Sequence, residues 1–361
     1  MAVGDASRAG DCIVIRYGGE EDYRLMVVDG GNADSGKALV AHLKAQFGTD
    51  VRLEHVVLTH HDNDHASGLR ELMTSDIPVA HLWMHIPWFL SVEAKHLFQR
   101  KDWSDDALQR TIKGEFSILS EIVDAASTKT KLHYAFQGTA IGPFTVLSPA
   151  RNAYLHLMPQ FERTPAPDQD TIEAAGLWIA KASILQRIVN LARTTVQSLT
   201  RETWSNEQLR DGAITSASNE SSVVLYGDFG TERVLLTGDA GVRGLTWAAD
   251  YANAVGFPLG AFTFVQVPHH GSRSNIGPTI LSRLVGPIQQ EGTRRFAAFV
   301  SAPKDDAKHP RVIVKNAFIR RGGNVVVTAG RGKVHWGGFN ARANYERASI
   351  ETLNPIVEAY D

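Results

Sequence analysis

The sequence has almost no cysteine: Cys12 is the only one among 361 residues, so an intrachain disulfide is excluded. Long apolar runs are also missing, since no stretch of about 18 apolar residues occurs, and a usual transmembrane helix is not expected. The opening residues MAVGDASRAG lack the basic and apolar segments of a signal peptide. These absences predict a cytoplasmic protein that does not act at a membrane.

An excess of charge of either sign is missing as well. The 37 Lys and Arg residues nearly balance the 39 Asp and Glu residues, which argues against sequence-independent binding of long nucleic acid. This balance does not exclude nuclease activity, because divalent cations would make a site locally positive. P-loop, Rossmann glycine and internal repeat patterns are also absent, so nucleotide-driven work and redox cofactors are not supported.

The most informative feature present is the segment LTHHDNDHASG at residues 58–68. It places four metal-ligand side chains within six residues, and these are His60, Asp62, Asp64 and His65. An aliphatic strand pattern precedes them and a helical pattern follows, so the ligands are expected in a strand-to-helix loop. The simpler interpretation is a polar turn in which Asp64 caps the helix. Four residues of ligand type at this spacing favour a hydrolytic centre with two ions, which needs two ligand sets.

This pattern resembles the metallo-β-lactamase superfamily, whose usual loop is His-x-His-x-Asp-His after a hydrophobic strand. Asp62 replaces the second His, as in the branch that contains the hydrolase domain of the competence-type DNA-uptake channel protein. Five further segments resemble that branch in the same order: GDCIVI at 10–15, VVDGG at 27–31, NESSVVL at 219–225, VLLTGDA at 234–240 and VPHHGS at 267–272. The resemblance covers roughly residues 10–150 and 217–336.

The resemblance implies a set of metal ligands. His60 and Asp62 would bind the first ion, Asp64 and His65 the second, and Asp239 would lie between the two. One member of the pair His269 and His270 would complete the second site. We favour His269, which is nearer the end of the predicted strand, and the other histidine would then contact substrate.

Two further residues are expected just behind the ligands. Asp29 resembles the carboxylate that orients ligands of the site, although it is equally explained as a turn-forming Asp-Gly. The histidine that the superfamily usually supplies before the bridging aspartate has no clear counterpart, and Asn219 stands nearby. A first site with two carboxylates and one histidine has harder ligands than a site of three histidines, because oxygen is a harder donor than imidazole nitrogen. The two divalent ions are therefore expected to be zinc or manganese, with magnesium also credible.

Substrate contacts are expected from the second half of the chain. Ser272 and Arg273 follow the histidine pair and can donate to phosphate oxygens, although Arg273 can equally be a solvated loop residue. His309 stands in a Ser and His-Pro segment that resembles the same branch, and it is a candidate for substrate contact or for protonating the leaving group. Otherwise it is a surface loop residue. The predicted catalytic residues are thus Asp64, Asp239 and His309.

The resemblance implies a metal-dependent hydrolase that uses a hydroxide bridging two divalent ions. The DNA-uptake branch points to a phosphodiesterase or nuclease acting on DNA, RNA or a nucleotide. Hydrolysis of an ester, lactone or amide is the alternative within enzymes, because fold does not settle function. A non-catalytic, metal-containing partner protein is the alternative outside them.

Periodicity alone predicts an α/β or α+β class with many short strands. The resemblance implies a four-layer αββα sandwich, formed as a single domain over residues 1–361. Residues 150–216 match none of the motifs and are expected to be a helical insertion, with helical spacing over Ile172 to Leu199. This insertion can be a lid, a self-association contact, a protein partner surface or simple outside packing, and the sequence does not choose among these.

Overall fold

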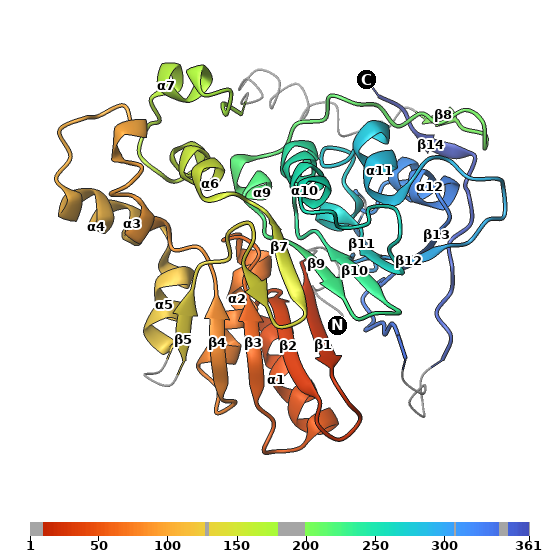
Figure 1. The fold of residues 1–361 in the computed structure, drawn as a ribbon, viewed down its shortest axis with the longest axis horizontal. Helices are drawn as coiled ribbons and strands as arrows, with labels where there is room; N and C mark the ends of the chain where they lie inside the picture. The colour runs from red at the N-terminus through yellow and green to blue at the C-terminus, as the bar shows by residue number, and fades with distance from the viewer. Residues whose placement is uncertain (1–9, 127–129, 180–198, 307, 339–345, 361) are drawn as a thin grey trace.

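The computed structural model describes residues 10–126, 130–179, 199–306, 308–338 and 346–360. Two β-sheets face one another, and helices cover the outer side of each sheet (Figure 1). The first sheet follows chain order, and its strands are β1 (Cys12–Tyr17), β2 (Arg24–Gly30), β3 (Leu53–Val57), β4 (Val79–Trp83) and β5 (Lys131–His133). β1 and β2 are antiparallel, whereas β2 to β5 are parallel.

The second sheet has the order β13-β12-β11-β10-β9-β7-β6. Its strands are β6 (Ala140–Ile141), β7 (Phe144–Ser148), β9 (Val224–Asp228), β10 (Arg233–Leu236), β11 (Phe264–Gln266), β12 (Phe296–Val300) and β13 (Gly323–Val327). β10 to β13 are parallel, and β10, β9, β7 and β6 pair in antiparallel fashion. A separate two-stranded sheet joins β8 (Leu199–Arg201) to β14 (Ile356–Glu358).

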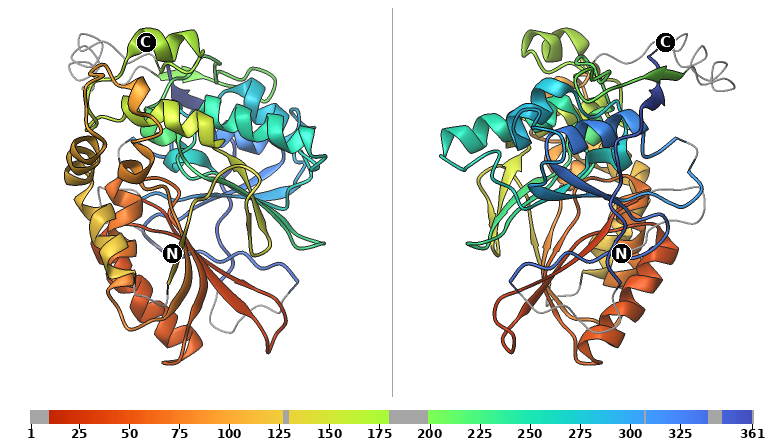
Figure 2. Two further views of the ribbon diagram at one scale, coloured as in Figure 1. Left: turned by 60° about the vertical axis from the view of Figure 1, so that its left-hand side comes forward. Right: turned by 90° about the vertical axis from the view of Figure 1, so that its right-hand side faces the viewer.

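Helices form the two outer layers, and Figure 2 shows them on opposite sides of the facing sheets. The first sheet is covered by α1 (Ala33–Phe47), α2 (Asn63–Met73) and α5 (Ser117–Ala125), and the second by α10 (Val242–Ala254), α11 (Pro278–Val285) and α12 (Val312–Arg320). The remaining helices are α3 (Pro87–Leu90), α4 (Asp105–Glu115), α6 (Arg151–Leu157), α7 (Gln169–Ala174) and α9 (Ala217–Glu220), with short 3-10 turns η1 (Lys95–Leu97), η2 (Met158–Gln160) and η3 (Pro268–Gly271).

The hydrophobic core lies in three layers that match this arrangement. Between the sheets, Met26 and Val28 of β2 pack with Phe144 of β7 and Leu225 of β9, and all four are at most 1% exposed. Two larger clusters fill the spaces between each sheet and its helices. Because the central strands are buried on both faces, they read as continuous apolar runs instead of alternating patterns. The four-layer αββα sandwich expected from the sequence is confirmed.

Within the segment 150–216, the described residues include helices α6 and α7 and the turn η2. Helix α7 ends at Ala174, residues 175–179 are not helical, and β8 begins at Leu199 and pairs with β14. Residues 180–198, which hold most of the predicted helix, lie outside the described residues. The described part before them is built into the core, since Tyr154 and Phe161 are 2% exposed and pack in the cluster under α2 and α5. The division into one domain with an insertion stays a prediction.

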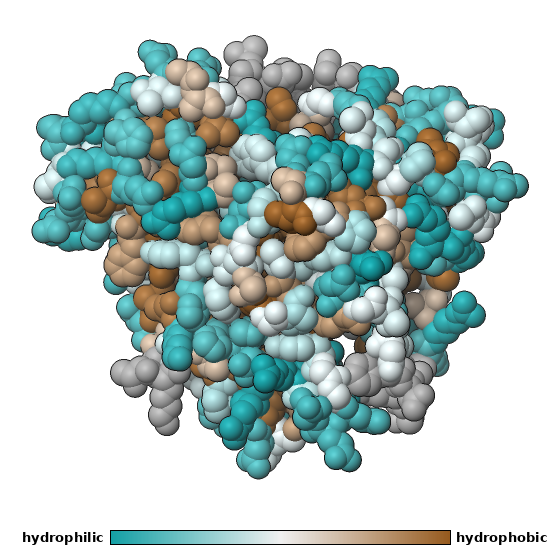
Figure 3. Space-filling model, in the orientation of Figure 1, coloured by the Kyte–Doolittle hydropathy of each residue, from teal (hydrophilic) through white to brown (hydrophobic). Residues whose placement is uncertain are grey.

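Within the described residues, no helix is long and apolar enough to cross a membrane. On the face drawn in Figure 3, apolar side chains occur in patches separated by polar residues.

Three glycines allow the start of α2 to approach β2 and α1 very closely. A Cβ atom on Gly68 would lie 1.9 Å from the carbonyl oxygen of Gly30, and one on Gly36 would lie 2.5 Å from the Cα of Gly68. The Gly68 N–H also donates to the carbonyl oxygen of Gly31 over 2.8 Å. Backbone therefore packs against backbone here, and this contact fixes the position of the loop that precedes α2.

We expect Gly68→Ala to lower the free energy of unfolding by about 2 kcal/mol or more, because the added methyl group forces backbone apart at a packed contact. Gly114→Ala, in α4, is the matched control: a Cβ there meets no atom within 4 Å, and the better helix propensity of Ala should stabilise the protein slightly. Urea denaturation of both variants checks this. Equal stability of Gly68→Ala and the wild type would contradict the close approach.

Candidate metal centre

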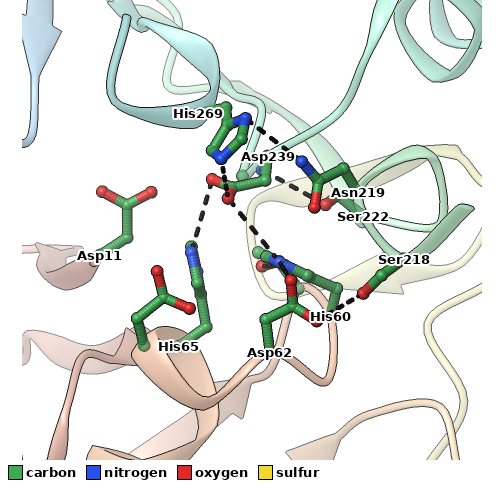
Figure 4. A network of polar contacts seen from close by, with 12 residues as sticks. Asp11, His60, Asp62, His65, Ser218, Asn219, Ser222, Asp239 and His269 are labelled. Atoms are coloured by element: carbon green, nitrogen blue, oxygen red, sulfur yellow. Dashed lines mark hydrogen bonds and ion pairs between the residues drawn. The ribbon is translucent and has the colours of Figure 1, made fainter. Parts of the chain in front are cut away.

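The predicted ligands come together at one edge of the sandwich, where parallel strands of both sheets end. The loop after β3 carries His60 and Asp62, and the first turn of α2 carries Asp64 and His65. The loop after β10 carries Asp239, and η3 after β11 carries His269 and His270. Carboxyl ends of parallel strands are the usual place for a binding site, because the loops there converge. Figure 4 shows His60, Asp62, His65 and His269 around Asp239.

The two histidines from the first sheet are held through their Nδ1 atoms. His65 Nδ1 donates to Asp29 Oδ2 over 2.7 Å. The Thr59 hydroxyl also donates to Asp29 Oδ2, over 2.7 Å, so its oxygen accepts the hydrogen of His60 Nδ1, at 3.1 Å. Asp29 thus orients His65 directly and His60 through Thr59, and both Nε2 atoms are left with a free lone pair.

The two histidines from the second sheet are held in the same way. His270 Nδ1 donates to the carbonyl oxygen of Ser301 over 3.0 Å. His269 Nδ1 lies 2.7 Å from Asn275 Oδ1, and the amide nitrogen of Asn275 donates to the carbonyl oxygen of Asp239, which fixes the orientation of the amide. Asn219, expected behind the ligands, places its amide nitrogen 3.2 Å from the same His269 nitrogen. All four imidazoles therefore direct an Nε2 lone pair away from their supports.

These Nε2 atoms converge on the carboxylate of Asp239, which is 2% exposed. His60 and His269 lie 3.8 and 3.5 Å from Asp239 Oδ2, and His65 and His270 lie 3.4 and 3.9 Å from Oδ1. The Nε2 atoms of His60, His65 and His270 and Oδ1 of Asp239 are buried without a hydrogen-bond partner. Buried polar atoms without partners are rare and costly, so such a group indicates a missing ligand.

The distances fit a cation. Two ligand atoms about 2.1 Å from one ion in tetrahedral geometry are about 3.4 Å apart, which is longer than a hydrogen bond and close to the separations seen here. Ligand atoms of Asp64, His65 and His270 all lie within 4.8 Å of one another, as do those of His60, His65 and Asp239. The donors are imidazole nitrogens and carboxylates, which suit zinc and manganese.

The structure divides the histidine pair differently from the sequence-based preference. His270, and not His269, lies beside Asp64: the distance from His270 Nε2 to Asp64 Oδ2 is 3.8 Å. His269 instead lies near the Asp239 oxygen that faces His60, on the side where the usual third histidine has no counterpart in the sequence. The reason is backbone conformation: both residues have positive φ, 45° and 55°, which turns their side chains to different oxygens of Asp239.

Asp62 approaches from the open side of the centre. Its Oδ2 lies 3.6 Å from His60 Nε2, and its other oxygen accepts a hydrogen bond from the Ser218 hydroxyl over 2.6 Å. Ser218 Oγ also lies 3.2 Å from His61 Nε2. Although burial opposes it, the His60 side chain holds the pKa of the Asp62 carboxyl well below its usual range. Ser218 and His61 therefore position an ionised carboxylate, and the sequence patterns did not indicate either of them.

Backbone strain is concentrated at this centre. Four described non-glycine residues have positive φ, and three of them are Asp29, His269 and His270. Such conformations cost on the order of 1 kcal/mol or more each and persist only where the surroundings enforce them. The strain indicates that side-chain placement at the centre is maintained at the expense of backbone stability.

Besides Ser218 and His61, three more residues near the centre were not singled out from the sequence. Asp11, 2% exposed, has an oxygen 4.0 Å from His270 Nδ1 and accepts a hydrogen bond from Gln266 over 2.7 Å. Gln266 also accepts from the backbone of Thr237 and so holds the loop that presents Asp239. Asn275 is the third. Asp11 belongs to the Gly-Asp motif at the start of the chain, which was the only signal available for it.

The predicted substrate residues are only partly brought to the centre. Ser272 lines the cavity beside it, but the Arg273 guanidinium donates to the carbonyl oxygen of Ala359 and lies over the ring of Tyr360. Arg273 is thus tied to the C-terminal segment and is not among the described residues that line the cavity. His309 stacks near His269, at 6.0 Å between ring centroids, and burial lowers its pKa to about 4. His309 is therefore neutral near pH 7, and its role as proton donor stays a prediction.

A cavity of about 1000 Å³ opens onto one side of the centre. Asp62, Asp64 and His269 face it with side chains that are 39, 41 and 28% exposed, whereas His60, His65, His270 and Asp239 are closed off at 3% or less. The ligand sets are thus buried on one side and accessible on the other. An ion held here would keep coordination positions open toward the cavity, as catalytic sites require.

We expect two ions per protein chain, with the second ligand set binding more tightly because its atoms are more compact. His270→Ala should remove the tighter ion and His269→Ala the weaker one, leaving about one ion in each variant. His309→Ala, which removes an imidazole beside the centre but outside both sets, should keep two. Elemental analysis after dialysis against limiting zinc measures this. Two retained ions in His269→Ala would exclude that residue as a ligand.

Metal affinity should depend on pH. Burial disfavours the charged form of His270, but the carboxylates of Asp239 and Asp64 outweigh burial and raise its pKa to about 9. Below that pH a proton occupies the nitrogen that an ion needs, and the carboxylates of Asp239 and Asp29 also raise the pKa of His65, so affinity should fall by at least about tenfold for each unit of pH below 9. Competition with a chelator of known protonation constants, between pH 6 and 9, tests the slope. A flat profile would show that the imidazole is already neutral without metal.

Comparison with known proteins agrees with this geometry. The family model of the Metallo-beta-lactamase superfamily matches residues 7–138, which include the first sheet and the His60 to His65 loop. No curated protein matches the chain, and nothing in these comparisons supports the DNA-uptake branch.

Three solved structures are similar over most of their length. The metallo-beta-lactamase fold protein YhfI from Bacillus subtilis is 10% identical, with 91% of this chain and 93% of that chain covered and a TM-score of 0.39. The metal-dependent hydrolase Tm1679 of the beta-lactamase superfamily is 14% identical, with 92% and 96% covered and a TM-score of 0.40. Zn²⁺-bound PqqB from Methylobacterium extorquens is 12% identical, with 87% and 84% covered and a TM-score of 0.35. At these TM-scores the likeness carries no argument about activity. The chain has mixed sheets and helices consistent with a metallo-beta-lactamase fold, and its residues 7–138 match that superfamily.

Proposed function

We propose that this protein is a metal-dependent hydrolase that cleaves phosphodiester bonds. The observation that carries the proposal is the convergence of four supported imidazoles on the buried carboxylate of Asp239, with the Nε2 atoms of His60, His65 and His270 left without partners. A cation between these imidazoles and the carboxylate would give the partnerless buried atoms the ligand that they lack.

His60, Asp62 and His269 would hold one ion, Asp64, His65 and His270 the other, and Asp239 would contact both. A bound divalent ion supplies Lewis acidity: it lowers the pKa of water and stabilises negative charge on the attacked group. The chain itself supplies orientation. Asp29, Ser301 and Asn275 keep the histidines in one tautomer, and Ser218 keeps Asp62 turned toward His60.

The protein residues also set the charge of the site. Three ligand carboxylates, Asp62, Asp64 and Asp239, offset most of the charge of two divalent ions, so a monoanionic phosphodiester can enter without large repulsion or excessive affinity. Asp62 in place of a histidine makes the first site harder and extends the usable metals to manganese and magnesium. Binding of DNA, RNA or a nucleotide, and a protein partner or self-association through 150–216, stay predictions.

Hydrolysis of a carboxyl ester or lactone is the second candidate. It is favoured by the described rim of the cavity, where one arginine, Arg163, stands with two glutamates, Glu115 and Glu162. A rim without a basic surplus does not attract anions and suits a neutral substrate equally well.

The test is turnover of bis-p-nitrophenyl phosphate by metal-stripped protein to which Mn²⁺, Zn²⁺ or Mg²⁺ is added separately. Activity should depend on the added ion and fall at least about 100-fold in Asp239→Asn, since changes to the residues behind metal ligands alone cost about 10- to 100-fold. Asp228→Asn, the same substitution at an exposed position on β9, is the control and should keep full activity.

Absence of turnover in protein shown to hold two ions would contradict the phosphodiester proposal. Turnover of p-nitrophenyl esters under the same conditions would then support the second candidate. Absence of both activities would favour a non-catalytic metal protein.

A further inference from the structure

The cavity beside the metal centre has few charges that could hold a polyanion. Among the described residues that line it, Arg163 is the only arginine or lysine, whereas Glu115 and Glu162 add two negative charges beyond the metal ligands. Proteins that bind a nucleic acid strand neutralise several phosphates with lysine and arginine along its path. The described part of the lining offers no such path, so a polynucleotide is a poor match for these residues.

One wall of the cavity is instead apolar. Phe116 and Ile118, at the junction of α4 and α5, line it together with Phe161 and with Ile214, which lies in the loop before α9. The rings of Phe116 and Phe161 both contact His61, at 4.8 and 4.4 Å between centroids, so this wall begins at the residue next to Asp62. The apolar surface is therefore continuous with the open side of the centre.

Ile214 is the exposed member of this apolar wall. Its side chain is 58% exposed, although it belongs to the most apolar residue type and stands at the mouth of the cavity. Neighbouring positions in the same loop carry hydroxyls: Thr215 and Ser216 accept hydrogen bonds from Asn219. An exposed isoleucine above a polar loop gains free energy only when an apolar group covers it.

We propose that the substrate is a small molecule in which an apolar group flanks the cleaved bond, and that this group packs against Phe116, Ile118 and Ile214. The inference rests on the proposed function, since it places the cleaved bond at the open side of the metal centre. A volume of about 1000 Å³ holds a molecule of the size of a common organic ligand, with room for a ring or a chain of several carbons.

The experiment measures binding separately from turnover. Titration calorimetry of the zinc-loaded protein with methyl-, butyl- and hexylphosphonate gives a dissociation constant for each, because a phosphonate presents the same oxygens to the ions whatever its alkyl group. Each added methylene that reaches the apolar wall should tighten binding about two- to fourfold. A ten-nucleotide single-stranded DNA serves as the polyanionic competitor.

Variants locate the effect. Ile214→Ser should reduce the ratio of hexyl- to methylphosphonate affinity by about fivefold or more, and Ile214→Leu should restore it, because both large side chains cover similar apolar area. Ile288→Ser is the matched control: this isoleucine is 42% exposed, follows α11 and is not among the lining residues, so the ratio should stay at the wild-type value.

Three outcomes would each overturn the inference. The first is an affinity that does not rise with alkyl length, and the second is an unchanged hexyl-to-methyl affinity ratio in Ile214→Ser. The third is displacement of hexylphosphonate by the oligonucleotide at a lower concentration than by butylphosphonate. Its failure is distinguishable from failure of the proposed function. If phosphonate affinity rises with alkyl length but the protein cleaves no phosphodiester, the apolar substrate group is supported and the phosphodiester reaction is rejected. If the protein cleaves a phosphodiester but phosphonate affinity does not depend on alkyl length, the reaction is supported and the apolar substrate group is rejected.

Discussion

Each of the four imidazoles at the centre gives its Nδ1 hydrogen to an oxygen fixed elsewhere in the fold, and the rest of the site depends on this constraint. Asp29, Thr59, Asn275 and Ser301 are the acceptors, and they come from the ends of strands in both sheets or from the loops beside them. A histidine whose Nδ1 is committed has one lone pair left, on Nε2, and its direction is set by the same hydrogen bond. Because the acceptors belong to different sheets, the centre forms only when the two halves of the sandwich meet.

The cost of this arrangement is visible in the backbone and in the packing. His269, His270 and Asp29 occupy left-handed conformations that few side chains tolerate, and Gly68 and Gly30 allow a helix to touch a strand without side chains between them. Both features fix where the ligands lie, which matters because coordination tolerates little error. The second ligand set is compact and reaches the cavity only through Asp64, whereas Asp62 and His269 complete the first set from the cavity side.

Much of this could be predicted from the sequence, and the exceptions have physical causes. The His60 to His65 segment and Asp239 each follow a short run of aliphatic residues that ends a strand, so their positions could be predicted from local pattern alone. β6, β8 and β14 have two or three residues each, too few for a period to appear. The partition of His269 and His270 depends on two positive φ angles that nothing in a His-His-Gly sequence specifies. Asp11 and Arg273 act through partners about 255 and 86 residues away, Gln266 and Ala359, and such pairings exist only after folding.

The most direct test of the account is anomalous diffraction from crystals of the zinc-loaded protein. The account predicts two peaks, one within about 2.2 Å of the Nε2 atoms of His60 and His269 and one within the same distance of those of His65 and His270, with Asp239 touching both. A single peak, or a His269 side chain turned away from the ion beside His60, would contradict the shared carboxylate with two ligand sets on which the proposed chemistry depends.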